Sequence, residues 1–144
     1  EVKDYIHRNV QHYNEQWNYL DAMRFNTSGS AVDIGTMWVN YQKKTEFNPI
    51  HYHDGIFSFV MWIDIPFSYE EERELPQAKK SNKAQCGTFQ FHYINMLGGI
   101  TNHPIEAKAG DFVLFPAGLN HSVYPFYTSD GYRISVSGNL YYIT

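Results

Sequence analysis

The sequence has one cysteine, no long hydrophobic run and no cluster of basic residues large enough to form a stripe. Cys86 has no partner within the chain, which excludes an intrachain disulfide and fits a reducing compartment. No stretch approaches the roughly 20 apolar residues of a membrane span, and residues 1–25 lack the basic start and apolar core of a signal peptide. We therefore expect a cytoplasmic protein without a membrane-spanning segment.

Positive charge is also scarce. The 11 Lys and Arg residues are outnumbered by 15 Asp and Glu residues, which gives a net charge of -4. The basic residues are scattered apart from a short group at Lys79, Lys80 and Lys83. A surface that follows a phosphate backbone needs a basic stripe, so the composition disfavours nucleic acid as a partner.

Aromatic residues, in contrast, make up 17% of the 144 residues. Aromatic side chains in this number are typical of a β-sheet core, and less often of the wall of a binding cleft. A chain of this length fits one domain, and such a domain buries roughly two thirds of the surface of its unfolded chain. We therefore expect a single domain, residues 1–144, that needs no disulfide.

Apolar residues near the N-terminus recur at helical spacing. The residues on this face are Ile6, Val10, Tyr13, Trp17 and Leu20. They predict an amphipathic helix at about 3–24, followed by turn-forming residues at 26–30. We expect this helix to pack on the outside of a sheet; the alternative is a helix that binds a partner.

After residue 30 the apolar period changes to two, which is typical of β-strands. The predicted strands are 34–42, 56–65, 88–95, 104–108, 111–115, 121–125 and 132–142. They predict a mostly β protein, with a sandwich or barrel core at about 31–144. The charged stretch 67–85 is predicted to be a loop, with a mobile lid beside a site as its functional interpretation.

Three histidines are candidate metal ligands. His51 and His53 lie two residues apart, where the sequence predicts the start of a strand, so that both imidazoles share one face. A third ligand is required, and His121 follows an apolar strand and the Pro-Ala-Gly turn at 116–118. Taken singly, each histidine is as easily structural; together they predict one metal site.

The last predicted strand has polar residues at alternate positions. Those on one face are Arg133, Ser135, Ser137 and Asn139. An arginine and a serine that share a face form a fork able to bind a carboxylate through two hydrogen bonds. An edge strand with its polar face in water is the alternative; if the fork faces the metal, the site suits an acidic cosubstrate.

With these motifs the sequence resembles the Fe(II)/2-oxoglutarate-dependent oxygenases, and within them a small group with an HxH…H…RxS pattern. The resemblance runs from about residue 36 to the C-terminus. The matching positions are Trp38, Val39, Asn40, 51–53, Gly87, 110–116, His121, 133–135 and Asn139. This resemblance implies a double-stranded β-helix, or jelly roll, with the N-terminal helix outside the sheet.

The resemblance also implies the activity. The three histidines would hold Fe(II), and 2-oxoglutarate would chelate it and place its far carboxylate on Arg133 and Ser135. Asn40 would hydrogen-bond the cosubstrate. With O2 as the other cosubstrate, the protein would be a dioxygenase, a hydroxylase whose substrate is a small molecule or a peptide.

One position departs from the superfamily. Most members have a carboxylate ligand two residues after the first histidine, and His53 occupies that position here. Asp54 follows it and would normally point to the opposite face. A β-bulge could turn this carboxylate inward, which keeps Asp54 as the reserve ligand.

The cupins provide a second resemblance and share the fold. Gly110, Pro116, Gly118 and His121 fit their second motif. The glutamate that cupins usually carry after the HxH pair is absent, and Pro125 replaces the last residue of their motif. The alternative function is therefore a cupin-like module that binds a small ligand, through a metal, without turnover.

Overall fold

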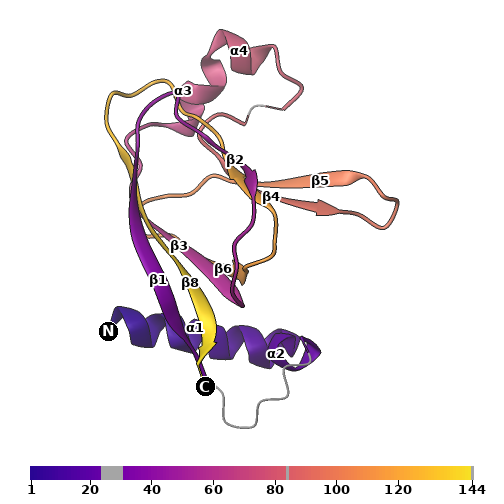
Figure 1. Ribbon diagram of the computed structural model, residues 1–144. Coiled ribbons are helices and arrows are strands. Elements are labelled where there is room, and N and C mark those ends of the chain that lie inside the picture. Colours follow the sequence, from indigo (N-terminus) through magenta and orange to yellow (C-terminus); the bar gives the residue numbers. More distant parts are fainter. Residues whose placement is uncertain (24–30, 84, 144) are drawn as a thin grey trace.

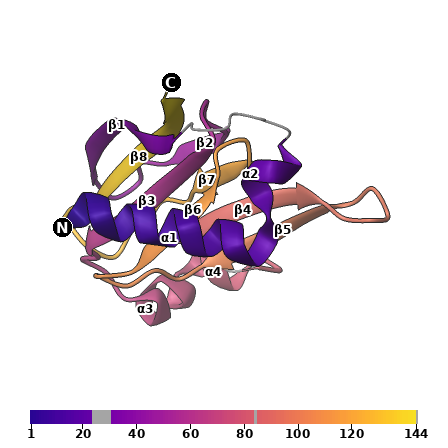
Figure 2. The ribbon, with the colours of Figure 1, turned by 90° about the horizontal axis from the view of Figure 1, so that it is seen from below.

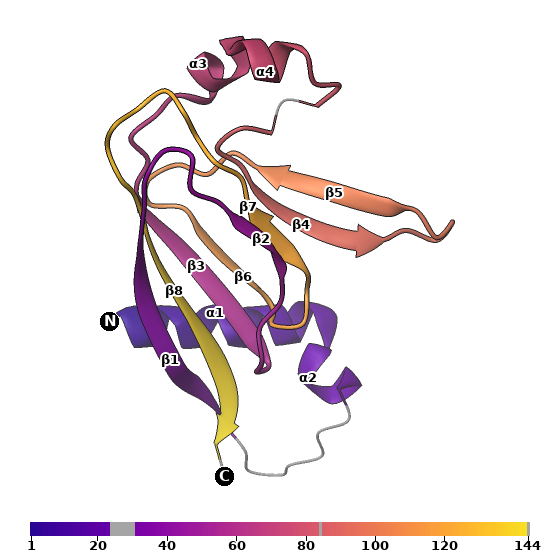
Figure 3. The same ribbon diagram turned by 45° about the horizontal axis from the view of Figure 1, so that its top comes forward.

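The computed structural model describes residues 1–23, 31–83 and 85–143, which form two four-stranded antiparallel sheets (Figure 1). The strands are β1 (Ala31–Gln42), β2 (Asn48–His51), β3 (Phe57–Asp64), β4 (Phe89–Ile94), β5 (Ile100–Ile105), β6 (Phe112–Pro116), β7 (His121–Val123) and β8 (Arg133–Ile143). The first sheet has the order β1-β8-β3-β6 and the second β2-β7-β4-β5 (Figure 3). This is the order of an eight-stranded jelly roll, as predicted.

The sequence pattern misses two strands at the edges of the second sheet. β2 has only four residues and contains Pro49, and β5 contains Pro104. Proline is tolerated on an edge strand because its missing N–H can face away from the sheet, but it hides the strand from pattern analysis. The strand predicted at 104–108 overlaps only the end of β5, and that prediction is wrong beyond Ile105.

The predicted N-terminal helix is two helices, α1 (Val2–Trp17) and α2 (Tyr19–Ala22). Asn18 between them adopts the left-handed conformation with a φ of 48°, which ends α1. Arg24 and the turn predicted at 26–30 lie outside the described residues. None of the helices in the described ranges has the length and apolar composition of a membrane span.

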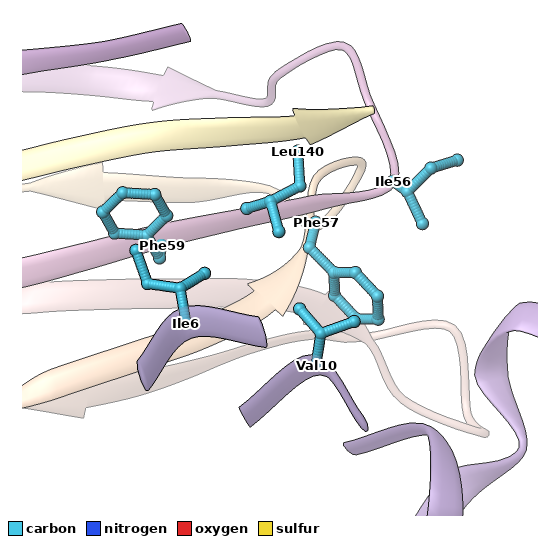
Figure 4. Close-up of a cluster of buried hydrophobic side chains, with 6 residues drawn as sticks. All are labelled: Ile6, Val10, Ile56, Phe57, Phe59 and Leu140. Carbon is cyan, nitrogen blue, oxygen red and sulfur yellow. The ribbon is translucent and has the colours of Figure 1, made fainter. Parts of the chain in front are cut away.

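Helix α1 lies across the outer face of the first sheet (Figure 2). Ile6 and Val10 point from α1 toward Phe57 and Leu140 in one buried cluster (Figure 4). Trp17, which the periodicity places on the same face, is 63% exposed. Helix α1 therefore covers the outer face of this sheet, and the inner face is turned toward the second sheet.

The stretch 67–85 contains two short helices, α3 (Tyr69–Glu74) and α4 (Pro76–Lys79), seen at the top of Figure 1. Within the charge run the carboxylate of Glu72 is fully buried and accepts hydrogen bonds from residues 127–128. The prediction of a loop is therefore wrong over 69–79, since a charge run does not reveal which carboxylate is buried. The mobility of this stretch stays a prediction.

Candidate metal centre

A cavity of about 500 Å³ is lined by residues of both sheets. Its lining includes the three candidate histidines, the guanidinium-bearing Arg133, and aromatic side chains such as Trp62 and Phe115. The first sheet contributes β1, β3, β6 and β8, and the second contributes β2, β4 and β7. The candidate metal ligands and Arg133, which are far apart in the sequence, therefore line the same cavity.

The three histidines come together in this cavity. His51 ends β2 and His121 begins β7, and the two are paired directly across these strands. His53 lies in the segment between β2 and β3. The His51–His53 pair was expected at the start of a strand, but it lies at the end of β2 and just after it. Nitrogen atoms of all three rings lie within 4.8 Å of one another, a spacing that one metal ion can bridge.

Backbone carbonyl groups orient two of the rings. His51 Nδ1 lies 2.7 Å from the carbonyl oxygen of Pro49, and His121 Nδ1 lies 2.9 Å from that of Leu119. Each Nδ1–H therefore donates to the backbone, and the lone pair is left on Nε2. The amide nitrogen of Asn48 is 3.3 Å from His51 Nε2, as expected for such an acceptor.

Burial favours the neutral form of two of these imidazoles. It lowers the pKa of His121 to about 4, and the carbonyl of Leu119 offsets only part of this effect. The pKa of His53 is lowered by burial first and by the nearby charge of His51 second. Both rings are thus neutral near pH 7, which is the form that binds a metal.

Asp54 does not join this cluster. Its side chain is exposed, and it is not among the groups whose ligand atoms lie within 4.8 Å of one another. The structure thus brings His53, and not the reserve ligand, to the other two histidines. The result is a set of three imidazole nitrogen donors without a carboxylate.

Arg133 lines the same cavity and is only 3% exposed. Its Nε and Nη2 both donate to Oε1 of Gln42, at 3.1 and 2.5 Å. Nη2 also donates to the carbonyl oxygen of Tyr124 at 3.0 Å, and Nη1 donates to that of Gly87. All of these partners are uncharged.

Two aromatic rings flank this guanidinium. The rings of Phe67 and Phe126 each lie 5.8 Å from its central carbon. In the described part of the chain, no ion pair joins Arg133 to a carboxylate. Burial lowers the pKa of Arg133 to about 10, and the charges of Tyr69 and Glu72 act in the opposite direction, so the group stays charged near pH 7. A buried cation that makes no direct ion pair with a described carboxylate is a suitable partner for a bound anion.

Small polar side chains line the cavity beside Arg133. Asn40 donates to Ser135 Oγ at 3.3 Å and to Ser137 Oγ at 3.1 Å, across the β1–β8 pair. The structure places these three residues on the cavity side, which agrees with the predicted face of β8. Sequence reasoning missed Gln42, although it lies two residues after Asn40 on the same strand and therefore shares its face.

Comparisons with known proteins indicate both a family and a fold. The model of a family described as "Putative 2OG-Fe(II) oxygenase" matches residues 36–139. The crystal structure of an oxidoreductase of the 2OG-Fe(II) oxygenase family from Burkholderia pseudomallei is similar, with a TM-score of 0.55 and 18% sequence identity. This likeness covers 82% of the present chain and 47% of the other, so the chain spans about half the length of that protein and shares its fold. No curated protein matches the sequence.

Proposed function

Since the chain belongs to this 2OG-Fe(II) oxygenase family, we propose that it is a non-haem Fe(II)- and 2-oxoglutarate-dependent oxygenase, a hydroxylase of a small-molecule or peptide substrate. The observation that carries the proposal is that Arg133, buried and without an ion pair among the described residues, lies in the same cavity as three converging histidines. A metal site alone is compatible with many functions. A metal site together with a buried cation suits a ligand that has a chelating end and a distant anionic end.

The donor set fits Fe(II). Imidazole nitrogen is a good ligand for iron, and His51, His53 and His121 would hold the ion and leave coordination positions open. Because all three donors are neutral, the chain itself does not compensate the charge of the ion. An anionic cosubstrate at the open positions would compensate it, which favours chelation by a carboxylate.

The polar residues around Arg133 fit the far carboxylate of 2-oxoglutarate. Arg133 would supply the charge, and Ser135, which shares its face, would supply a hydroxyl donor. Asn40 would add an amide donor beside them. Aromatic neighbours keep water away, so this ion pair is stronger than it would be at the surface.

The residues of the chain would hold and orient the metal and the cosubstrate, and these bound groups would supply the oxidation. Iron and 2-oxoglutarate together would provide a reaction with O2 in which 2-oxoglutarate becomes succinate and CO2 and one oxygen atom is transferred to the substrate. Trp62, Phe89 and Phe115 line the cavity and would exclude water from the reacting groups. None of these residues needs to transfer a proton.

The first experiment titrates 2-oxoglutarate into Fe(II)-loaded protein under nitrogen, measured by calorimetry. We expect Arg133→Ala to weaken binding by roughly 30-fold to several thousand-fold, because a buried carboxylate loses its charged partner. Arg133→Lys should be a poor substitute, since lysine is a point charge without the planar fork. Arg8→Ala, on the exposed side of α1, is the matched control and should bind as wild type does.

Equal affinities of wild type and Arg133→Ala would contradict the oxygenase assignment. A cupin-like module that binds a small ligand without turnover would then be the better function. One observation favours that alternative: Arg133 already makes four hydrogen bonds within the chain. Succinate formation from 2-oxoglutarate under O2 would separate the two functions directly.

A further inference from the structure

Gln42 occupies the edge of the Arg133 guanidinium at which a carboxylate binds with two hydrogen bonds. Its Oε1 accepts from both Nε and Nη2, the two donors of that edge. The two residues are direct partners across the β1–β8 pair, and both side chains line the cavity. The side-chain carbonyl of Gln42 thus stands where one carboxylate oxygen would stand.

The donors of Arg133 are nearly used up by the chain itself. A guanidinium has five N–H groups. Two donate to Gln42, one to the carbonyl of Tyr124 and one to the carbonyl of Gly87, which leaves one on Nη1. A carboxylate that makes a two-point contact with Arg133 must therefore replace a partner that is already there.

Gln42 is the partner that can move. The carbonyl groups of Gly87 and Tyr124 belong to the backbone, and both residues are held by further backbone hydrogen bonds, Gly87 N–H to Pro125 and Tyr124 N–H to Thr88. Displacing either would separate neighbouring chain segments. Gln42 can give up its bonds by side-chain rotation alone.

We propose that Gln42 is an internal competitor for Arg133, whose side-chain carbonyl holds the fork of Arg133 and gives way only to the distal carboxylate of a dicarboxylate ligand. The inference rests on the proposed function and adds to it a residue that sets the affinity for a dicarboxylate cosubstrate. A charged acceptor outcompetes a neutral amide carbonyl because charge-assisted hydrogen bonds are stronger. A 2-oxo acid without a distal carboxylate gains nothing at Arg133 and leaves Gln42 in place.

The exchange also reaches the segment between β1 and β2. Nε2 of Gln42 donates to the carbonyl oxygen of Glu46 at 2.5 Å. Residues 43–47 follow β1, and Phe47 at their end is 65% exposed and lines the cavity. When Gln42 leaves Arg133, this hydrogen bond is strained or lost, so the dicarboxylate competes with two interactions of one side chain.

The test compares two substitutions at this position. Gln42→Leu removes the competing carbonyl and keeps a similar shape, and Gln42→Glu places a permanent carboxylate beside Arg133. Gln11→Leu, an exposed glutamine of α1, is the matched control. The probes are 2-oxoglutarate and pyruvate with Fe(II)-loaded protein under nitrogen, and glutarate with metal-free protein, which tests the Arg133 end independently of the metal.

We expect Gln42→Leu to bind 2-oxoglutarate and glutarate about threefold to tenfold more tightly than wild type, since one competing hydrogen-bonded partner is gone. Gln42→Glu should bind both at least about 30-fold more weakly. Pyruvate affinity should be the same in all four proteins, because pyruvate has no distal carboxylate.

Three outcomes would overturn the inference. If Gln42→Leu binds 2-oxoglutarate equally or more weakly, Gln42 supports Arg133 and does not compete with the ligand. If pyruvate affinity changes as much as 2-oxoglutarate affinity, the effect is a general change of the cavity. In both cases the proposed oxygenase function is unaffected, because the Arg133→Ala titration tests it separately. If wild type binds neither 2-oxoglutarate nor glutarate, the proposed function and this inference both fail.

Discussion

At the scale of single residues, burial decides the protonation state of the candidate ligands. His121 is 3% exposed, and burial lowers its pKa to about 4, well below the usual value of about 6.5. A histidine that stays neutral at mildly acidic pH keeps its metal-binding form. The same burial costs stability as soon as solution conditions favour the protonated ring.

This predicts how the metal-free protein responds to pH. Between about pH 6.5 and about pH 4 the unfolded chain binds the proton and the folded chain does not, so the free energy of unfolding rises with pH through this window. We expect His121 to account for roughly 3 kcal/mol over that range. Urea unfolding at several pH values measures the slope.

The comparison is between His121→Gln and a matched surface variant. His121→Gln should flatten the slope between pH 4 and pH 6.5, whatever its stability at neutral pH. His12→Gln, at an exposed position of α1, should keep the wild-type slope. An unchanged slope in His121→Gln would contradict the assigned pKa.

At the scale of elements, α3 depends on a buried carboxylate. Glu72 Oε1 accepts hydrogen bonds at 2.8 Å from the backbone N–H groups of Tyr127 and Thr128 and from the hydroxyl of Thr128. Its Oε2 has no hydrogen-bond partner among the described residues. A helix of six residues is not stable by itself in water, so this tertiary anchor decides whether α3 forms.

We therefore expect Glu72→Leu to lower the free energy of unfolding by about 2–4 kcal/mol, because two partly buried backbone N–H groups and a hydroxyl group lose their acceptor. Equilibrium urea unfolding measures the change. Glu71→Leu in the same charge run is the control; Glu71 is exposed, and its replacement should change stability by no more than about 0.5 kcal/mol. Equal effects of the two substitutions would show that the anchor is unimportant.

At the scale of the whole molecule, stability and function occupy opposite faces of the first sheet. The outer face packs against Ile6 and Val10 of α1 (Figure 4). The inner face carries Arg133 and faces the cavity, to which the second sheet and the segment after β2 contribute the histidines. The two faces share strands, but neighbouring residues of a strand point to opposite sides, and Ile6 and Val10 themselves do not line the cavity. A change in the helix packing should therefore leave the cavity largely intact.

We expect Ile6→Ala to lower the free energy of unfolding by about 2–5 kcal/mol, since Ile6 is fully buried and the cavity left behind adds to the lost burial. Iron affinity and 2-oxoglutarate affinity of the folded variant should equal those of wild type. Val2→Ala, at an exposed position of α1, is the control for stability. A loss of iron affinity in Ile6→Ala would contradict the separation of the two faces.

The sequence by itself determined the sandwich or barrel core of β-strands, the outer helix and the face on which each polar residue of β8 lies, and the resemblance implied the jelly roll. These features repeat every two or every three to four residues, so many positions report the same period and single exceptions such as Trp17 do not hide it. The two-residue spacing of His51 and His53 and the position of His121 after a turn also predicted which histidines meet. The family match over residues 36–139 confirms the resemblance that these motifs indicated.

Only the tertiary structure decided the rest. Edge strands β2 and β5 and the burial of Glu72 depend on which distant segments pack against each position, and a local pattern contains no record of that packing. The same holds for Gln42 and Arg133, which lie 91 residues apart in the sequence and share two hydrogen bonds. Strand pairing brings such residues together because backbone hydrogen bonds fix the register of whole strands, and the side chains then meet whichever partner that register sets opposite them.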